Sequence, residues 1–223
     1  MCHKAAITGL RLMSQLGFLA ARSALWGMLL AVSLFAGCSQ LPPPAQLPSV
    51  SARGAGAKAI SLYDGDEDGT LVREEVQESA ALQATWGLLD ADEDGAITAK
   101  EIAARIRMWQ KSSARVVVAS PTFYLGEEPL VGASITLEPA KILGSAYPIV
   151  SAVTDRKGTA HFGGSDPSYP GVYSGLYTVR VSKKIEGKEI IPARYNSQSE
   201  LGIEISKANW FGALRWFGLE AEQ

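Results

Sequence analysis

The stretch "DGDEDGTLVREE" occupies residues 64–75, and the stretch "DADEDGAITAKE" occupies residues 90–101. The second stretch repeats three aspartates, a glycine and a glutamate of the first in the same order and at the same spacing. The first holds six acids and one base, and the second holds five acids and one base. Carboxylates at this density repel one another unless a cation neutralises them. The repeat therefore points to a cation-binding function.

The spacing within each repeat is the one that calcium requires. Calcium takes six to eight oxygen ligands, and a short loop wraps it when carboxylates occupy positions 1, 3 and 5. Position 6 must turn sharply, which suits glycine, position 7 offers its backbone carbonyl, and a glutamate at position 12 supplies two oxygens. The predicted ligands of two Ca²⁺ ions are Asp64, Asp66, Asp68, Thr70 and Glu75 in loop 1, and Asp90, Asp92, Asp94, Ala96 and Glu101 in loop 2.

Both loops match the full pattern D-x-[DN]-x-[DN]-G-x5-E and so resemble the EF-hand family. A single acidic turn could arise by chance in a polar surface segment, but two complete loops preceded by apolar residues at matching offsets argue against that. The resemblance implies a short β-bridge between Leu71 and Ile97, the residues at position 8. Thr98 at position 9 can hold a bridging water and Val72 cannot, so we expect loop 2 to bind more tightly.

The segment between the loops leaves two arrangements open. Residues 76–89 are too few for two full helices and a linker. One shared helix would hold the loops about 20 Å apart and prevent their β-bridge. Two very short helices are the alternative. After loop 2, Ile102, Ile106 and Trp109 fall at helical spacing and predict an amphipathic exit helix.

The N-terminus reads as a leader rather than as part of the fold. Residues 23–37, "SALWGMLLAVSLFAG", are uncharged and apolar, as in a signal-peptide core. They end directly before Cys38, and "LFAGC" resembles the lipobox of bacterial lipoproteins. That resemblance implies removal of residues 1–37, lipidation of Cys38 and a place in the bacterial cell envelope, with Ser39 pointing to the outer membrane. A free Cys38 thiol after ordinary cleavage is the alternative. Residues 38–56, rich in Pro, Gly and Ser, are predicted to be a tether.

From residue 113 the hydrophobic pattern alternates with a period of two, which predicts strands. Several short strands with turns between them predict one antiparallel β-sandwich over residues 113–223. The segments "GEEPLVGASITLEP", "AVTDRKGTAHF" and "PGVYSGLYTVRVSK" resemble the carboxypeptidase regulatory-like, or transthyretin-like, sandwich. That resemblance implies a Greek-key fold of about seven strands and a non-catalytic structural or adhesive module. Val131, Ala133, Ile135 and Leu137 alternate and are predicted to face the core.

The predicted organisation is therefore an α+β protein of two domains, an EF-hand pair over residues 57–112 and the sandwich. We expect no enzyme: His161 is the one histidine left after leader removal, and it alternates with Phe162, so it should face solvent. Convergent polar groups around His161 would instead favour catalysis.

The pI of about 5.8 and the lack of a basic run exclude a nucleic-acid partner. An unidentified protein partner fits a second reading, a dockerin-like interaction module, which needs an exposed apolar face on the helices. The aromatic run at 209–218 suits either core packing or a partner or bilayer surface.

Overall fold

The computed structural model describes residues 49–163, 171–210 and 216–221. The predicted leader, Cys38 and most of the predicted tether lie outside these residues. The chain divides into two compact units, Met1–Gln46 and Leu47–Gln223, and every described residue belongs to the second. No helix within the described ranges combines the length and the apolar character needed to cross a membrane.

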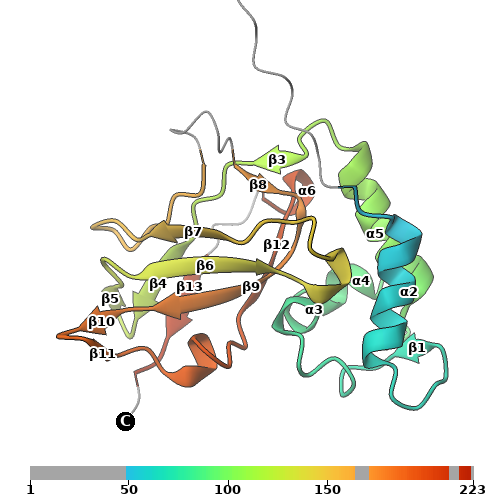
Figure 1. The fold of residues 1–223 in the computed structure, drawn as a ribbon, viewed down its shortest axis with the longest axis horizontal. Coiled ribbons are helices and arrows are strands. Elements are labelled where there is room, and N and C mark those ends of the chain that lie inside the picture. The colour runs from blue at the N-terminus through green and yellow to red at the C-terminus, as the bar shows by residue number, and fades with distance from the viewer. Residues whose placement is uncertain (1–48, 164–170, 211–215, 222–223) are drawn as a thin grey trace, which may run out of the picture. The chain divides into compact units, whose positions relative to one another are not determined.

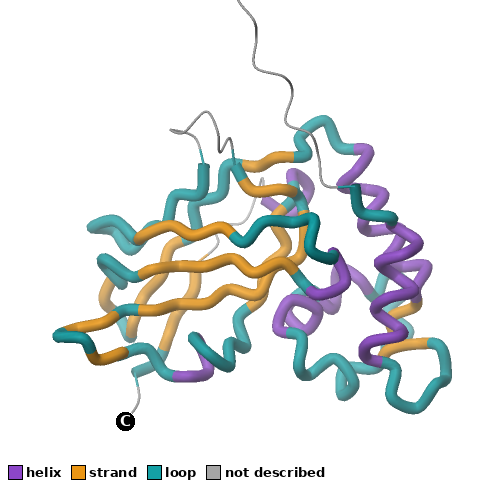
Figure 2. Tube along the Cα trace, viewed as in Figure 1, coloured by secondary structure: helices purple, strands orange, loops and turns teal. Residues whose placement is uncertain are grey.

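The described unit is of the mixed α+β class, as the sequence predicted (Figure 1). Its first part contains the helices that surround the two acidic loops, while the second part is built mainly of strands (Figure 2). The elements of the first part are α2 (Ala52–Tyr63), β1 (Thr70–Leu71), α3 (Ala80–Ala84), α4 (Trp86–Leu89), β2 (Ile97–Thr98) and α5 (Ala99–Lys111).

Helix α2 begins earlier than the sequence suggested. The Ser51 hydroxyl accepts a hydrogen bond from the backbone N–H of Gly54 and caps the helix at Ala52, so the end of the predicted tether is helical. The buried side of α2 consists of small residues, among them Ala55, Gly56 and Ala59. Such residues give no strong apolar periodicity, which is why the segment reads as a linker.

Two short helices, and not one shared helix, connect the loops. Thr85 separates α3 from α4, and its hydroxyl donates to the carbonyl of Ala81 at 2.6 Å. Ser79 caps the start of α3. Of the two arrangements that the sequence left open, the structure has the two short helices, because a threonine that bonds back to the preceding turn interrupts the run.

Helix α5 confirms the predicted exit helix. Thr98 and Glu101 form a capping box at its start, in which each side chain bonds the other residue's backbone N–H. Ile102, Ile106 and Trp109 are all buried, as their spacing predicted. Trp86 and Leu89, which precede loop 2, are buried in the same cluster of side chains.

The second part of the unit consists of several small sheets. A four-stranded sheet has the order β12-β9-β6-β7, a three-stranded sheet has the order β13-β4-β5, and β3-β8 and β10-β11 are two-stranded. The elements are β3 (Val116–Val117), β4 (Thr122–Leu125), β5 (Glu128–Pro129), β6 (Ser134–Pro139), η1 (Lys141–Leu143), β7 (Val150–Val153), β8 (Val172–Tyr173), β9 (Gly175–Ser182), β10 (Lys184–Ile185), β11 (Lys188–Glu189), η2 (Ala193–Tyr195), β12 (Gly202–Ile205), α6 (Lys207–Trp210) and β13 (Trp216–Leu219).

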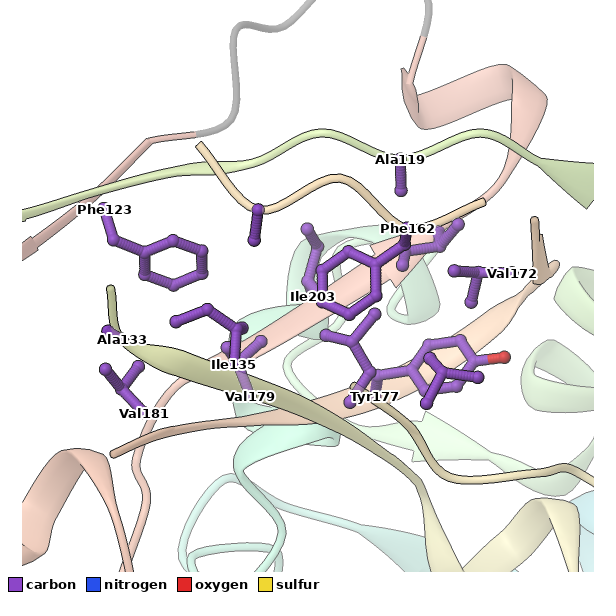
Figure 3. Close-up of a cluster of buried hydrophobic side chains, with 14 of the residues drawn as sticks. Ala119, Phe123, Ala133, Ile135, Phe162, Val172, Tyr177, Val179, Val181 and Ile203 are labelled. Atoms are coloured by element: carbon purple, nitrogen blue, oxygen red, sulfur yellow. The ribbon is translucent and has the colours of Figure 1, made fainter. Parts of the chain in front are cut away.

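Side chains from these sheets meet in one hydrophobic cluster (Figure 3). Ala133, Ile135 and Leu137 point into it with no exposed surface, in agreement with the predicted alternation. Val131 does not continue the pattern: it lies before β6 begins and is 41% exposed. The turn through Gly132, at a φ of 71°, breaks the pleat between Val131 and Ala133.

One strand pair departs from the predicted all-antiparallel arrangement. β13 runs parallel to β4, with Phe217 opposite Phe123. Their rings stack at 5.0 Å between centroids, so at least this member of the C-terminal aromatic run serves core packing, while Trp216 is 68% exposed. Hydrophobic alternation alone does not distinguish parallel from antiparallel pairing.

The helical and strand-rich parts share buried surface within the described unit. Leu143 and Leu176 of the second part belong to the same hydrophobic cluster as Ile106 of the first. The Arg105 guanidinium on α5 binds the fully buried carboxylate of Glu204 on β12 through two hydrogen bonds, of 2.7 and 2.9 Å. The predicted boundary at residue 112 thus separates two kinds of secondary structure inside one compact unit.

Candidate metal centre

Each acidic loop gathers its three aspartates around one point. In loop 1, carboxylate oxygens of Asp64, Asp66 and Asp68 all lie within 4.8 Å of one another, and in loop 2 those of Asp90, Asp92 and Asp94 do the same. The sequence predicted these six residues as ligands at positions 1, 3 and 5. Oxygens at such separations can all contact one cation, because Ca²⁺–oxygen distances of about 2.3–2.6 Å allow neighbouring ligands to be this far apart.

The backbone of the two loops turns in the same way. Glycine at position 6 has a φ of 87° in Gly69 and 88° in Gly95, a conformation that favours glycine. The residue at position 4 is also left-handed, with a φ of 63° at Glu67 and 60° at Glu93. This second turn was not predicted, because glutamate gives no sequence signal for a positive φ. Together the two turns fold the chain back on itself and bring the aspartates together.

The aspartate at position 1 uses only one of its two carboxylate oxygens in hydrogen bonds, and it does so in both loops. Its Oδ2 accepts the N–H of the glycine at position 6, at 3.0 Å from Gly69 to Asp64 and at 3.2 Å from Gly95 to Asp90. Its Oδ1 is buried and has no hydrogen-bond partner in either loop. A buried carboxylate oxygen without a partner is costly. The same atom is left unpaired in both loops, and a cation bound among the three aspartates would supply the missing contact.

The glutamate at position 12 closes each loop through the backbone. Glu75 accepts from Gly65 at 2.7 Å and from Val72 at 2.9 Å, one bond to each carboxylate oxygen. Glu101 likewise accepts from Ala91 at 2.9 Å and from Thr98 at 2.8 Å. Neither glutamate belongs to the groups of oxygens that all lie within 4.8 Å of one another. Both carboxylates are nevertheless tied to the start and the end of their own loop.

These hydrogen bonds favour the charged form of both glutamates. The backbone N–H groups of Val72 and Gly65 hold the pKa of Glu75 below its ordinary value. Burial opposes ionisation of Glu101, but hydrogen bonds from Thr98 and Ala91 outweigh it, and the pKa of Glu101 also lies below its ordinary value. The loops therefore present ionised glutamates near neutral pH, as a cation site requires.

The residues predicted at position 7 contribute differently. Thr70 and Ala96 were predicted to offer only their backbone carbonyls. Thr70 also donates its hydroxyl to Asp68 Oδ1 at 2.7 Å, and the N–H of Ala96 donates to Asp94 at 2.9 Å. The hydroxyl and the N–H of Thr70 lower the pKa of Asp68. Both residues thus orient the aspartate at position 5.

The two loops are paired side by side. β1 and β2 form an antiparallel ladder in which Leu71 lies opposite Ile97 and Thr70 lies opposite Thr98. Leu71 and Ile97 are both fully buried. The β-bridge that the EF-hand resemblance implied is therefore present, and the arrangement with separated loops is not.

A second cluster of polar groups surrounds His161. The Ser120 hydroxyl lies 3.1 Å from His161 Nδ1, and Asp155 Oδ2 lies 3.3 Å from His161 Nε2. The sequence predicted that His161 faces solvent, and its side chain is indeed 58% exposed. Neither of two cavities in the described ranges, of about 800 and 610 Å³, is lined by any of these three residues. The arrangement has the connectivity of a Ser-His-Asp chain but sits open to water.

Comparisons with protein-family models, with curated proteins and with solved structures find no match for this chain. The functional argument therefore rests on the geometry of the loops and on the motifs of the sequence.

Proposed function

We propose that each acidic loop binds one Ca²⁺ ion and that the chain is a calcium-binding, lipid-anchored protein of the bacterial cell envelope. The observation that carries the calcium proposal is the buried, unpartnered Oδ1 of Asp64 and of Asp90. Both atoms lie at position 1 of a loop whose other aspartates converge on the same point. A cation is the partner that would satisfy these atoms and neutralise the loops at once.

The chemistry of the donors selects calcium over other cations. The predicted ligands are carboxylate and carbonyl oxygens, with no histidine or cysteine among them, which disfavours zinc and other transition metals. Each loop is predicted to offer three aspartates, one backbone carbonyl and both carboxylate oxygens of a glutamate. These oxygens leave little room for the water molecules that magnesium keeps in its octahedral sphere. Calcium accepts such a flexible shell of six to eight oxygens.

Calcium binding would couple the loops through the ladder between β1 and β2. Loop 1 carries a formal charge of −5 and loop 2 of −4, so each cation relieves repulsion in its own loop and across the pair. Because Leu71 and Ile97 pack between the loops, ordering one loop preorganises the other. The proposal therefore includes positive cooperativity between the two sites.

A calorimetric titration with CaCl₂ tests the proposal. We expect two sites with dissociation constants of about 10⁻⁵ to 10⁻³ M, the range of weaker sensors and extracellular modules, and a Hill coefficient clearly greater than one. Glu75→Gln and Glu101→Gln should each weaken binding by at least about tenfold, since each removes a charged ligand with two oxygens. Loop 2, which has Thr98 at position 9, should be the tighter site.

Glu78→Gln is the matched control, because Glu78 is an exposed glutamate just outside loop 1. It should bind calcium like the unaltered chain. The absence of any calcium-dependent heat at millimolar ion would contradict the proposal, as would wild-type binding by both loop variants.

The envelope location rests on the lipobox-like sequence before Cys38. Mass spectrometry of the protein purified from its native membranes should find an acylated N-terminal Cys38 and no leader. Cys38→Ala should release the protein into the soluble fraction, because the acyl chains supply the membrane affinity. An unmodified Cys38 thiol would mean that the chain is secreted without an anchor.

For residues 113–223 we propose a Greek-key β-sandwich that acts as a non-catalytic structural or adhesive module. The dockerin-like alternative needs an exposed apolar face on the helices that flank the loops. Within the described part of those helices, Leu62 is the one large hydrophobic side chain that is clearly exposed. The apolar faces of α4 and α5 are instead buried inside the unit, which favours the structural module.

A further inference from the structure

A cavity of about 610 Å³ lies where the end of α5 meets α6. Its lining includes Ala104, Met108 and Trp109 from α5 and Ala208 from α6, which are apolar. Arg107, Lys111 and Lys207 also line it, and all three are exposed. The cavity thus combines an apolar lining with three cationic side chains.

The positive charge of the three basic residues is not balanced by any acidic residue of the cavity lining. Among the described residues that line the cavity, none has an acidic side chain. The sequence from Ile102 to Gly126 contains four basic residues and no acid, in a chain whose formal net charge is −2. Arg105 forms an ion pair with Glu204, and the other three basic residues of this stretch are exposed. A ligand for this surface must therefore be anionic and must carry apolar groups.

Trp109 contributes a buried aromatic ring to the cavity lining. Its side chain is only 3% exposed, and its indole N–H has no hydrogen-bond partner. Because this N–H is closed to solvent, Trp109 adds its ring to the apolar part of the lining. The apolar lining and the three cations together suit an amphipathic anion better than a simple inorganic anion.

The end of α5 lies beside the first residues that the structure describes. Gln110 on α5 donates a hydrogen bond to the carbonyl of Val50 at 2.7 Å, so the start of α2 and the end of α5 lie together (Figure 1). Cys38 lies only a short way before Val50 in the sequence, and even a fully extended chain, at about 3.3–3.6 Å per residue, would span at most about 40 Å between them. Acylation of Cys38 would therefore limit the distance between a bilayer and Val50, which the end of α5 contacts, to about 40 Å.

We propose that the cavity and its cationic rim of Arg107, Lys111 and Lys207 dock on the surface of a bilayer containing anionic phospholipid. The proposal rests on the proposed lipid anchor for its proximity to the bilayer. The surface itself recognises phosphate headgroups through the three cations and takes apolar lipid atoms between Met108 and Trp109. Along α5, Arg107 and Lys111 lie about 9 and 15 Å beyond Glu101, the last residue of loop 2.

Vesicle sedimentation tests the surface without the anchor. The chain from Ser39 onward retains the whole compact unit Leu47–Gln223 and lacks Cys38. We expect it to bind vesicles of phosphatidylcholine mixed with phosphatidylglycerol and to ignore vesicles of phosphatidylcholine alone. Added salt should abolish binding, because exposed charges are screened. The triple change Arg107→Gln, Lys111→Gln and Lys207→Gln should weaken binding about a hundredfold, at about fivefold for each cation lost.

The matched control removes three exposed cations elsewhere, through Arg156→Gln, Lys184→Gln and Lys188→Gln. It has the same net charge and should bind nearly as well as the unaltered chain. Equal losses in the two triple variants would overturn the proposal, and so would equal binding to both kinds of vesicle. If neither vesicle binds while the first triple change abolishes self-association, the occupant is a second copy and the proposal is wrong. None of these results depends on Cys38, whose acylation is tested separately by mass spectrometry.

Discussion

At the scale of single residues, hydrogen bonding separates the acidic side chains that need a cation from those that do not. Asp155 has both oxygens engaged: Oδ1 accepts from Lys157 at 2.8 Å and from Thr159 at 2.9 Å, and Oδ2 faces His161. Hydrogen bonds from Thr159, Lys157 and His161 lower the pKa of Asp155. Asp64 and Asp90, in contrast, each keep one buried oxygen unpaired. Asp155 thus organises a turn, whereas Asp64 and Asp90 are suited to bind a cation.

The polar groups around His161 allow a prediction about the reactivity of the Ser120 hydroxyl. The Ser120 hydroxyl and Asp155 Oδ2 lie within hydrogen-bond distance of His161 Nδ1 and Nε2, at 3.1 and 3.3 Å. Water competes for both bonds, because the His161 and Asp155 side chains are 58% and 42% exposed. We therefore expect no covalent labelling of Ser120 by a fluorophosphonate probe, and no difference between the unaltered chain and Ser120→Ala in ester hydrolysis. Labelling that Ser120→Ala and His161→Gln both abolish would establish an activated serine.

At the scale of elements, close backbone approach explains the small residues before loop 1. Gly56 on α2 packs against the start of α5, and a Cβ placed on it would lie 2.2 Å from the carbonyl oxygen of Ala99. Because Ala99 immediately follows Thr98 of β2, this contact also sets the position of α2 relative to loop 2. Ala55 and Gly56 therefore belong to a packing surface, although the run "GAGA" at residues 54–57 has a composition typical of a tether.

Gly56→Ala tests that role. A methyl group cannot fit 2.2 Å from a backbone oxygen, so α2 must move away from α5, and we expect a loss of about 1–3 kcal/mol in the free energy of unfolding. Gly87→Ala is the control, because no atom lies within 4 Å of its added Cβ, and helix propensity should stabilise it by up to about 1 kcal/mol. Urea denaturation measures both. A Gly56→Ala protein as stable as the unaltered chain would mean that residues 52–56 are a linker after all.

At the scale of the whole molecule, the described unit is held together across its two kinds of secondary structure. Leu143 and Leu176 pack among the helices, and the Glu204 carboxylate on β12 depends on Arg105 of α5. Since loop 2 leads directly into α5, ordering that loop with calcium should also stabilise the contacts with β12. We therefore expect the unit to unfold in one transition whose midpoint rises with calcium.

Arg105→Met isolates this connection. It removes the cation from a fully buried carboxylate, which keeps only the hydrogen bond from the Ser206 hydroxyl, so the free energy of unfolding should fall by about 3–5 kcal/mol. The control is Arg194→Met, which breaks the exposed ion pair between Arg194 and Glu220, where the side chains are 44% and 82% exposed. That change should cost about 1 kcal/mol or less. Similar losses in the two variants, measured by urea denaturation at fixed calcium, would contradict the argument.

Local patterns were sufficient for a large share of this description. The α+β class, the buried face of α5 and the core face of β6 followed from hydrophobic periods of 3.6 and two, which each element expresses within its own residues. The two loops were located by the spacing of their own acidic residues, because their turns depend on glycine at one position. What they bind, and the role of Cys38, remain proposals that these patterns support.

Contacts between distant segments decided the rest. Residues 76–89 also suited one continuous helix. In the structure the helix is interrupted at Thr85, and Leu71 pairs with Ile97 so that the two loops lie side by side. The parallel pairing of β13 with β4, the burial of Gly56 and the pairing of α5 with β12 each link residues far apart in the chain. Such contacts arise from packing in three dimensions, where shape and charge must match between segments. A periodic sequence specifies which face of an element is buried, and only the tertiary structure specifies what that face meets.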